Sequence, residues 1–95
     1  MTYESFIDSL KSDSPPNVNG ELLALWHDAK GDWEASHNIA QEIHSKDGAL
    51  IHAYLHRKEG DIWNADYWYR NAGAKRPEEK LEIEWITLVT RFINK

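Results

Sequence analysis

The stretch LLALWHDAKGDW at residues 22–33 recurs 29 residues later, in altered form, as IHAYLHRKEGDI at residues 51–62. At equivalent positions the two stretches share a small residue, a histidine and a Gly-Asp pair, namely Ala24 and Ala53, His27 and His56, and Gly31-Asp32 and Gly60-Asp61. A fixed internal period of this size is typical of stacked helical units rather than of a conventional enzyme fold. The repeat therefore predicts a modular, helical architecture.

Each Gly-Asp pair suits the turn between two antiparallel helices. A glycine directly after a helix supplies the left-handed backbone that ends it, and the following aspartate can accept hydrogen bonds from the free amides of the next helix. A turn this short returns the chain alongside itself. We therefore expect two helical hairpins around Gly31-Asp32 and Gly60-Asp61, in repeat-like units of about residues 20–45 and 48–73, with the second helix of the first unit over residues 33–45.

Helical periodicity also extends to both ends of the chain. Apolar residues spaced by three and four over residues 3–10 predict a first short helix. Asp47 is expected to cap the fourth helix, and Pro77 fits the first turn of a C-terminal capping helix at about residues 77–94. The sequence thus predicts a single all-α, α-solenoid-like domain over residues 1–95, with about six helices: two hairpins flanked by N- and C-terminal helices.

The composition excludes several classes of function. The chain has 95 residues, no cysteine and a net charge of −5. Disulfides and thiolate chemistry are therefore absent, and general nucleic-acid binding, which needs a positive field, is not expected. No apolar run approaches the roughly 18 residues of a membrane span, and the stretch from Met1 to Phe6 does not resemble a secretory signal. We expect a cytoplasmic protein without membrane association.

Residues 53–72 resemble a tetratricopeptide or related α-solenoid repeat. In such repeats a small residue precedes a Gly-Asp turn, and the second helix carries an alanine, an aromatic residue four positions on and a further alanine. The matching positions here are Ala53, Gly60-Asp61, Ala65, Tyr69 and Ala72. The interval of 29 residues is shorter than the usual 34. Residues 54–73 also resemble a family of small bacterial proteins of unassigned function, and neither resemblance implies catalytic residues.

An aromatic and basic stripe is the first candidate functional feature. Trp63, Tyr67 and Arg70 share one face of a helix, and these residue types are enriched at binding hot spots. With the nearby basic residues Arg57 and Lys58, they predict a small, non-catalytic interaction module that binds an unidentified protein partner or a second copy of itself and needs no cofactor. The alternative is that the C-terminal helix covers the stripe.

Histidines provide the competing hypothesis. His52 and His56 lie four residues apart on one helix, and stacking of the two units would bring His27 beside His56. Three imidazoles in this arrangement predict a site for a divalent transition metal such as zinc, nickel or copper, or for another small ligand. Alternatively, the histidines are packed structural residues. His37 and His44 are expected on the surface.

Overall fold

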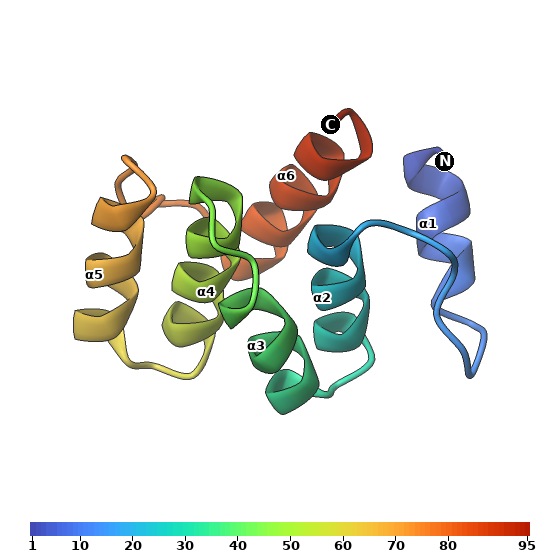
Figure 1. Ribbon diagram of the computed structural model, residues 1–95, viewed down its shortest axis with the longest axis horizontal. Helices are drawn as coiled ribbons and strands as arrows, with labels where there is room; N and C mark the ends of the chain where they lie inside the picture. Colours follow the sequence, from blue (N-terminus) through green and yellow to red (C-terminus); the bar gives the residue numbers. More distant parts are fainter.

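The computed structural model describes residues 1–95 and contains six α-helices and no strand, which confirms the all-α prediction. The helices are α1 (Tyr3–Ser9), α2 (Gly20–Ala29), α3 (Trp33–Gln41), α4 (Lys46–Lys58), α5 (Ile62–Asn71) and α6 (Leu81–Ile93). The molecule measures 34 × 26 × 24 Å, with α1 and α5 at its opposite ends (Figure 1). None of the helices combines the length and apolar character that a membrane span requires.

Both predicted Gly-Asp turns are present. Gly31 and Gly60 have φ angles of 86° and 90°, in the left-handed region that glycine adopts without strain. Asp32 and Asp61 then cap α3 and α5, and each carboxylate accepts a hydrogen bond from the amide three residues later, at 3.0 and 3.2 Å. As a result α2 packs against α3 and α4 packs against α5 as two hairpins (Figure 1).

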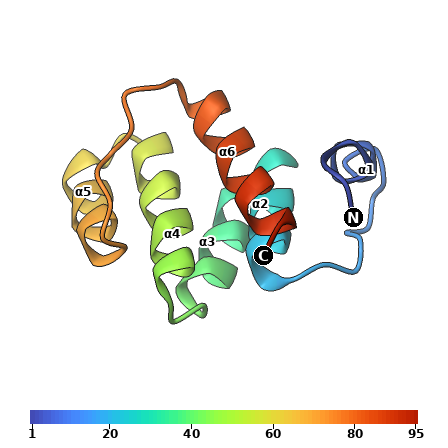
Figure 2. The same cartoon turned by 90° about the horizontal axis from the view of Figure 1, so that it is seen from above.

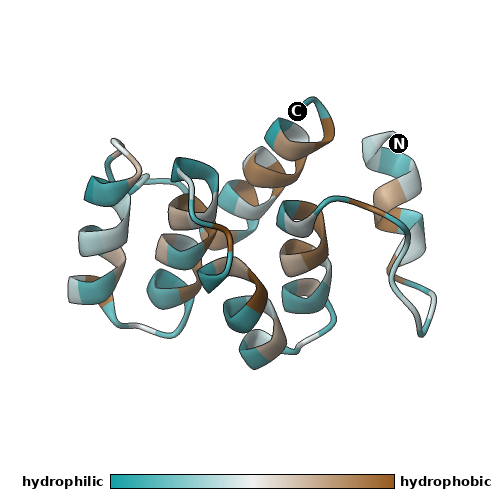
Figure 3. Cartoon of the chain, viewed as in Figure 1, coloured by the Kyte–Doolittle hydropathy of each residue, from teal (hydrophilic) through white to brown (hydrophobic).

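The main core lies between α2, α4 and α6, whereas α5 contributes only to a smaller cluster at the edge. Figure 2 shows α6 passing over α2 and α4, and Figure 3 shows apolar residues on all three helices. Two long-range hydrogen bonds fix α6: the Trp85 indole N–H donates to the Leu25 carbonyl at 3.1 Å, and the Asn19 side chain donates to the Phe92 carbonyl at 3.3 Å. Phe6 of α1 completes the core beside Trp85.

The turn between α3 and α4 differs from the prediction. Helix α3 ends at Gln41 instead of continuing to Ser45, and Ser45, not Asp47, caps α4 by accepting from the Gly48 amide at 3.3 Å. Asp47 instead binds Arg91 of α6 at 2.9 Å. Sequence periodicity could not show this ion pair, because its two residues lie 44 positions apart.

The C-terminal helix begins at Leu81 and not near Pro77. The backbones of α5 and α6 do not approach each other, and α6 packs on α2 and α4 instead. The residues between Asn71 and Leu81 therefore have to cross from one end of the molecule to its centre, and Pro77 lies in this linker (Figure 2). Glu82 and Glu84 occupy the first turn of α6, where negative charge is favourable.

Candidate metal centre

Three histidines from two helices meet on one side of the molecule. His37 of α3, His52 and His56 of α4 each offer a ring nitrogen within 4.8 Å of the others. The Nε2 atoms of His37 and His52 are 2.9 Å apart, at hydrogen-bond distance. His52 and His56 are buried and His37 is half-buried. Converging imidazole nitrogens of this kind are the ligand set that divalent transition metals prefer.

Packing between the hairpins places these rings. His52 and His56 are one helical turn apart on α4, so their rings stack at a centroid distance of 4.8 Å. Helix α3 is held against α2 by the buried Ser36, whose hydroxyl donates to the Ala24 carbonyl at 2.6 Å. The next residue, His37, consequently faces α4 and reaches His52.

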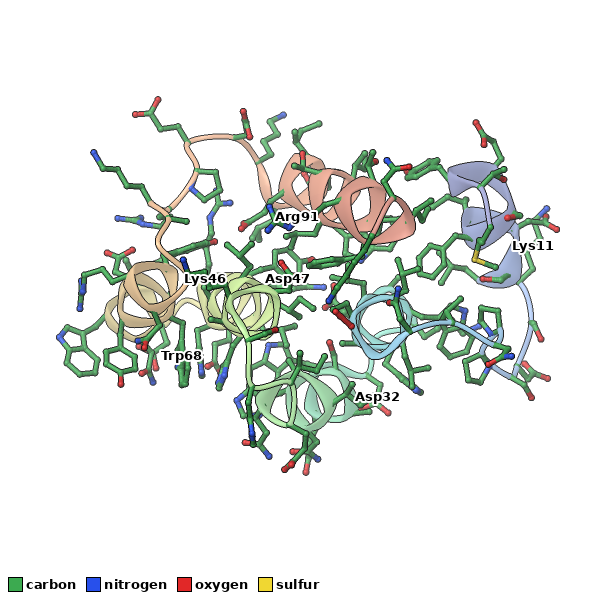
Figure 4. All side chains as sticks on the ribbon, turned by 45° about the horizontal axis from the view of Figure 1, so that its top comes forward. Lys11, Asp32, Lys46, Asp47, Trp68 and Arg91 are labelled. Atoms are coloured by element: carbon green, nitrogen blue, oxygen red, sulfur yellow. The ribbon has the colours of Figure 1, made fainter.

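Two tryptophans restrict the orientation of the histidine rings. Trp33, four residues before His37 on α3, stacks on its ring with a centroid distance of 4.8 Å. Trp68 of α5 stacks on His52 at 4.1 Å, and Figure 4 shows its side chain directed away from α6, on the side of the molecule where α3 lies. The Trp33 indole donates to the Leu55 carbonyl at 2.9 Å, which fixes that ring in turn.

Glu59 orients the third imidazole. Its Oε2 lies 2.6 Å from Nδ1 of His56, so Nδ1 is the nitrogen that donates to the carboxylate. A carboxylate on the second nitrogen of a metal-binding histidine is a common arrangement that fixes the tautomer and raises the basicity of the ligand. Nε2 is therefore the nitrogen of His56 that remains free to bind a metal.

The environment also favours the neutral, metal-binding form of His37 and His52. Burial, together with the charges that His37 and His56 would carry, lowers the pKa of His52 to about 4. Burial and the neighbouring His56 lower the pKa of His37, although Glu59 partly opposes this shift. Since a metal binds only deprotonated imidazole, both residues are ready to bind at neutral pH without releasing a proton.

We expect acid to destabilise the metal-free protein. The pKa of His52 in the folded state lies below the ordinary value of 6.5, so between pH 6.5 and 4 the unfolded chain binds more protons than the folded one. The free energy of unfolding is therefore highest above pH 6.5 and falls by about 1.4 kcal/mol per pH unit below it, from this group alone.

Urea denaturation at pH 7.5, 6.0 and 5.0 measures this loss, with His52→Gln as the comparison. The variant should lose less stability than the native protein over the same interval, because it lacks the titrating group. Parallel pH dependences in the two proteins would contradict the assignment to His52.

The position of His27 differs from the sequence hypothesis. It lies outside the histidine cluster, with its ring at the edge of the neighbouring Trp26 at 5.1 Å. Helix α2, which carries His27, and helix α4, which carries His56, are the equivalent helices of the two units and are separated by the width of one unit. The helix of the first unit that faces His56 is α3. His37, expected on the surface, therefore takes the place predicted for His27, whereas His44 is exposed as expected. The pair Trp33 and His37, one turn apart after the Gly-Asp turn, is the sequence signal that could have identified this residue.

The aromatic stripe is exposed. Trp63 exposes 77% of its surface and Tyr67 exposes 44%, and Arg70 is also exposed. The backbone of α6 does not approach α5, and the side chains of the stripe are exposed, so the alternative in which the C-terminal helix covers the stripe is wrong.

Arg57 and Lys58, predicted to belong to the same surface, each bind a buried carboxylate. Arg57 binds the buried Glu84 at 2.7 Å, and Lys58 binds the buried Asp28 at 2.8 Å. A buried carboxylate requires a cation or hydrogen-bond donors, and each basic side chain is consequently held in an ion pair, although the Lys58 side chain remains 40% exposed.

No family model matches the chain, and neither does any curated protein or solved structure. The resemblance to tetratricopeptide repeats therefore remains a prediction that rests on the residues around the two Gly-Asp turns. The function has to be inferred from the chemistry of the histidine cluster and of the exposed surface.

Proposed function

We propose that this protein binds a divalent transition metal ion through His37, His52 and His56. The observation that carries the proposal is the convergence of three imidazole nitrogens within 4.8 Å, in rings held by stacked tryptophans and by Glu59. A histidine that serves only a structural role needs just one hydrogen-bond partner. His37 and His52 share one hydrogen bond between their Nε2 atoms, and a metal ion would replace it with a bond to each of the two nitrogens.

The His37–His52 pair is close to the geometry of a bound state. Nitrogens bound to a tetrahedral zinc ion at about 2.0–2.1 Å stand about 3.3 Å apart. His37 and His52 therefore have to separate by only a few tenths of an ångström from their present 2.9 Å. Imidazole ligands suit zinc, nickel and copper, and the set contains no carboxylate that would favour magnesium or calcium.

Thermal unfolding of metal-stripped protein tests this proposal. Zinc, nickel or copper at 100 times the dissociation constant should stabilise the native protein by about 2.7 kcal/mol, which raises the melting temperature of a domain of this size by about 10 °C or more. His37→Ala should weaken metal binding at least about 100-fold and remove the shift at the same metal concentration. Each variant is compared with its own metal-free form, so a change in intrinsic stability does not enter the result.

His44→Ala is the matched control, because His44 is an exposed histidine outside the cluster. Its melting temperature should rise with metal as the native protein's does. Quenching of Trp33 and Trp68 fluorescence by copper gives an independent measure of binding beside the rings. The proposal is wrong if no metal shifts the native melt, or if His37→Ala and His44→Ala respond equally.

The exposure of Trp63 supports a second candidate function, an interaction module. A tryptophan that exposes 77% of its surface beside an exposed tyrosine and arginine is a costly arrangement for an isolated surface. We propose that Trp63, Tyr67 and Arg70 contact a protein partner, of which a second copy of the chain is the simplest case. This role is non-catalytic and independent of the metal site.

Sedimentation equilibrium over a range of concentrations tests the self-associating case. The native protein should show a mass that rises toward that of a dimer, and Trp63→Ala or Tyr67→Ala should weaken association by at least about 1–2 kcal/mol, or tenfold. Metal affinity should remain unchanged in both variants. A native protein that stays monomeric at millimolar concentration would contradict self-association through this stripe.

A further inference from the structure

The histidine cluster contains three protein ligands and no fourth. Helix α3 contributes His37 and α4 contributes His52 and His56, and no additional histidine or carboxylate offers an atom within 4.8 Å of all three. Glu59 and Asp61 form an overlapping group with His56. However, Glu59 contacts Nδ1, and the two nitrogens of an imidazole point to opposite sides of the ring. Glu59 therefore supports His56 from behind and does not reach a metal at Nε2.

The number of ligands distinguishes two kinds of site. Structural zinc sites are closed by four protein ligands, whereas sites with three protein ligands complete a tetrahedron with water or an exchangeable molecule. Three neutral imidazoles also bring no negative charge into direct contact with a divalent cation. In a partly buried environment the charge of the cation favours an anion in the fourth position.

A small pocket adjoins the cluster at His52 and matches an anionic ligand. It has a volume of about 280 Å³ and lies between the end of α3, the start of α4 and Trp68 of α5. Its polar lining consists of His52 with Gln41, His44, Ser45 and Asn71, and it includes no aspartate or glutamate. This absence is notable in a chain of net charge −5. The volume is at the lower limit for drug-sized ligands, so the pocket suits a small anion.

We infer that a metal ion held by His37, His52 and His56 keeps one open coordination position, and that a small monovalent anion binds there from the adjoining pocket in exchange for water. The inference rests on the proposed metal binding. The exchange is a ligand substitution at the metal: the anion forms one bond to the ion and one water molecule leaves. Gln41, Ser45 and Asn71 of the pocket lining carry hydroxyl and amide groups that can donate to an anion.

Cobalt absorption spectroscopy tests the metal site and the open position separately. Cobalt(II) added to the metal-stripped protein should give the intense visible bands of a four-coordinate nitrogen site at one metal per chain. Sodium azide should then shift these bands in a saturable manner, while sodium perchlorate at the same ionic strength should not. Absence of intense cobalt bands contradicts the metal site itself. Intense bands that azide leaves unchanged, or one cobalt per two chains, would overturn the open position but not the metal site.

A charge introduced into the pocket provides the residue-level test. Gln41→Glu preserves the shape of the side chain and adds one negative charge, so the azide affinity should fall about fivefold while one cobalt still binds per chain. Asn17→Asp adds the same charge at an exposed position outside the pocket and should leave azide binding unchanged. Equal azide affinities in these two variants would show that the anion does not enter through this pocket.

Discussion

Glu84→Ala is expected to lower the free energy of unfolding by about 3–5 kcal/mol. The buried Glu84 carboxylate accepts from the Arg57 guanidinium at 2.7 Å and from the Tyr69 hydroxyl at 2.5 Å. Burial and this carboxylate raise the pKa of Tyr69, so its hydroxyl keeps its proton and remains a donor. Removing Glu84 leaves the largely buried cation of Arg57 without its counter-charge, which is more costly than losing the contact itself.

Urea denaturation of the metal-free protein at pH 7 measures this effect. Glu82→Ala is the matched control, because Glu82 is exposed in the same turn of α6, and its effect should stay within about 0.5 kcal/mol. The double variant Arg57→Met, Glu84→Met should recover part of the loss, since no charge is left unpaired. A loss below 1 kcal/mol for Glu84→Ala would show that water reaches the Arg57 guanidinium.

This network also supports the metal centre indirectly. It joins α4, α5 and α6 through Arg57, Tyr69 and Glu84, although α5 and α6 have no backbone contact. Trp68, the residue before Tyr69, stacks on His52. Loosening of α5 in Glu84→Ala should therefore expose His52 before the whole domain unfolds.

Gly48→Ala is expected to destabilise the protein by about 3 kcal/mol, at the upper end of the range for overpacked positions. A Cβ atom at Gly48 would lie 2.0 Å from the carbonyl oxygen of Ile43 and 2.8 Å from its Cβ atom. Both are fixed parts of the turn between α3 and α4, so the turn has to shift. From helix propensity alone, replacing glycine by alanine stabilises a helix by about 1 kcal/mol. The change in stability expected for Gly48→Ala has the opposite sign.

The same substitution should weaken metal binding, because this turn sets the position of His37 against His52 and His56. Gly20→Ala serves as the control: its Cβ atom would meet only the Ile43 side chain, at an ordinary 3.5 Å. Chemical denaturation gives the stability of each variant, and the zinc-dependent shift in melting temperature gives its metal binding. If Gly48→Ala equals or exceeds Gly20→Ala in stability, the close approach of Gly48 to Ile43 is not a constraint in solution.

A second buried carboxylate resembles the Glu84 site. Asp28 of α2 accepts from the Tyr54 hydroxyl at 2.7 Å and from the Lys58 ammonium at 2.8 Å. Each of the two carboxylates thus accepts hydrogen bonds from one tyrosine and one basic residue, and all four of these partners lie on helices other than that of the carboxylate. The two basic residues are neighbours, Arg57 and Lys58, at the end of α4, so this helix end is held from both α2 and α6.

The sequence by itself determined the number of helices and the two hairpin turns, but not every helix boundary. The positive φ of Gly31 and Gly60 and the caps at Asp32 and Asp61 depend on interactions within three or four residues. Such local interactions leave a recognisable signature in the amino-acid order. The pairing of His52 with His56 was accessible for the same reason, since one helical turn brings the two rings together.

Only the tertiary structure decided which third histidine joins them and which charged residues are buried. His37 lies 15 residues from His52, and Arg57 lies 27 residues from Glu84. Whether such pairs meet depends on how the helices pack, and packing is set by the combined burial of many side chains rather than by any single spacing. Sequence periodicity identifies the buried face of a helix, but not the residue of another helix that it will face.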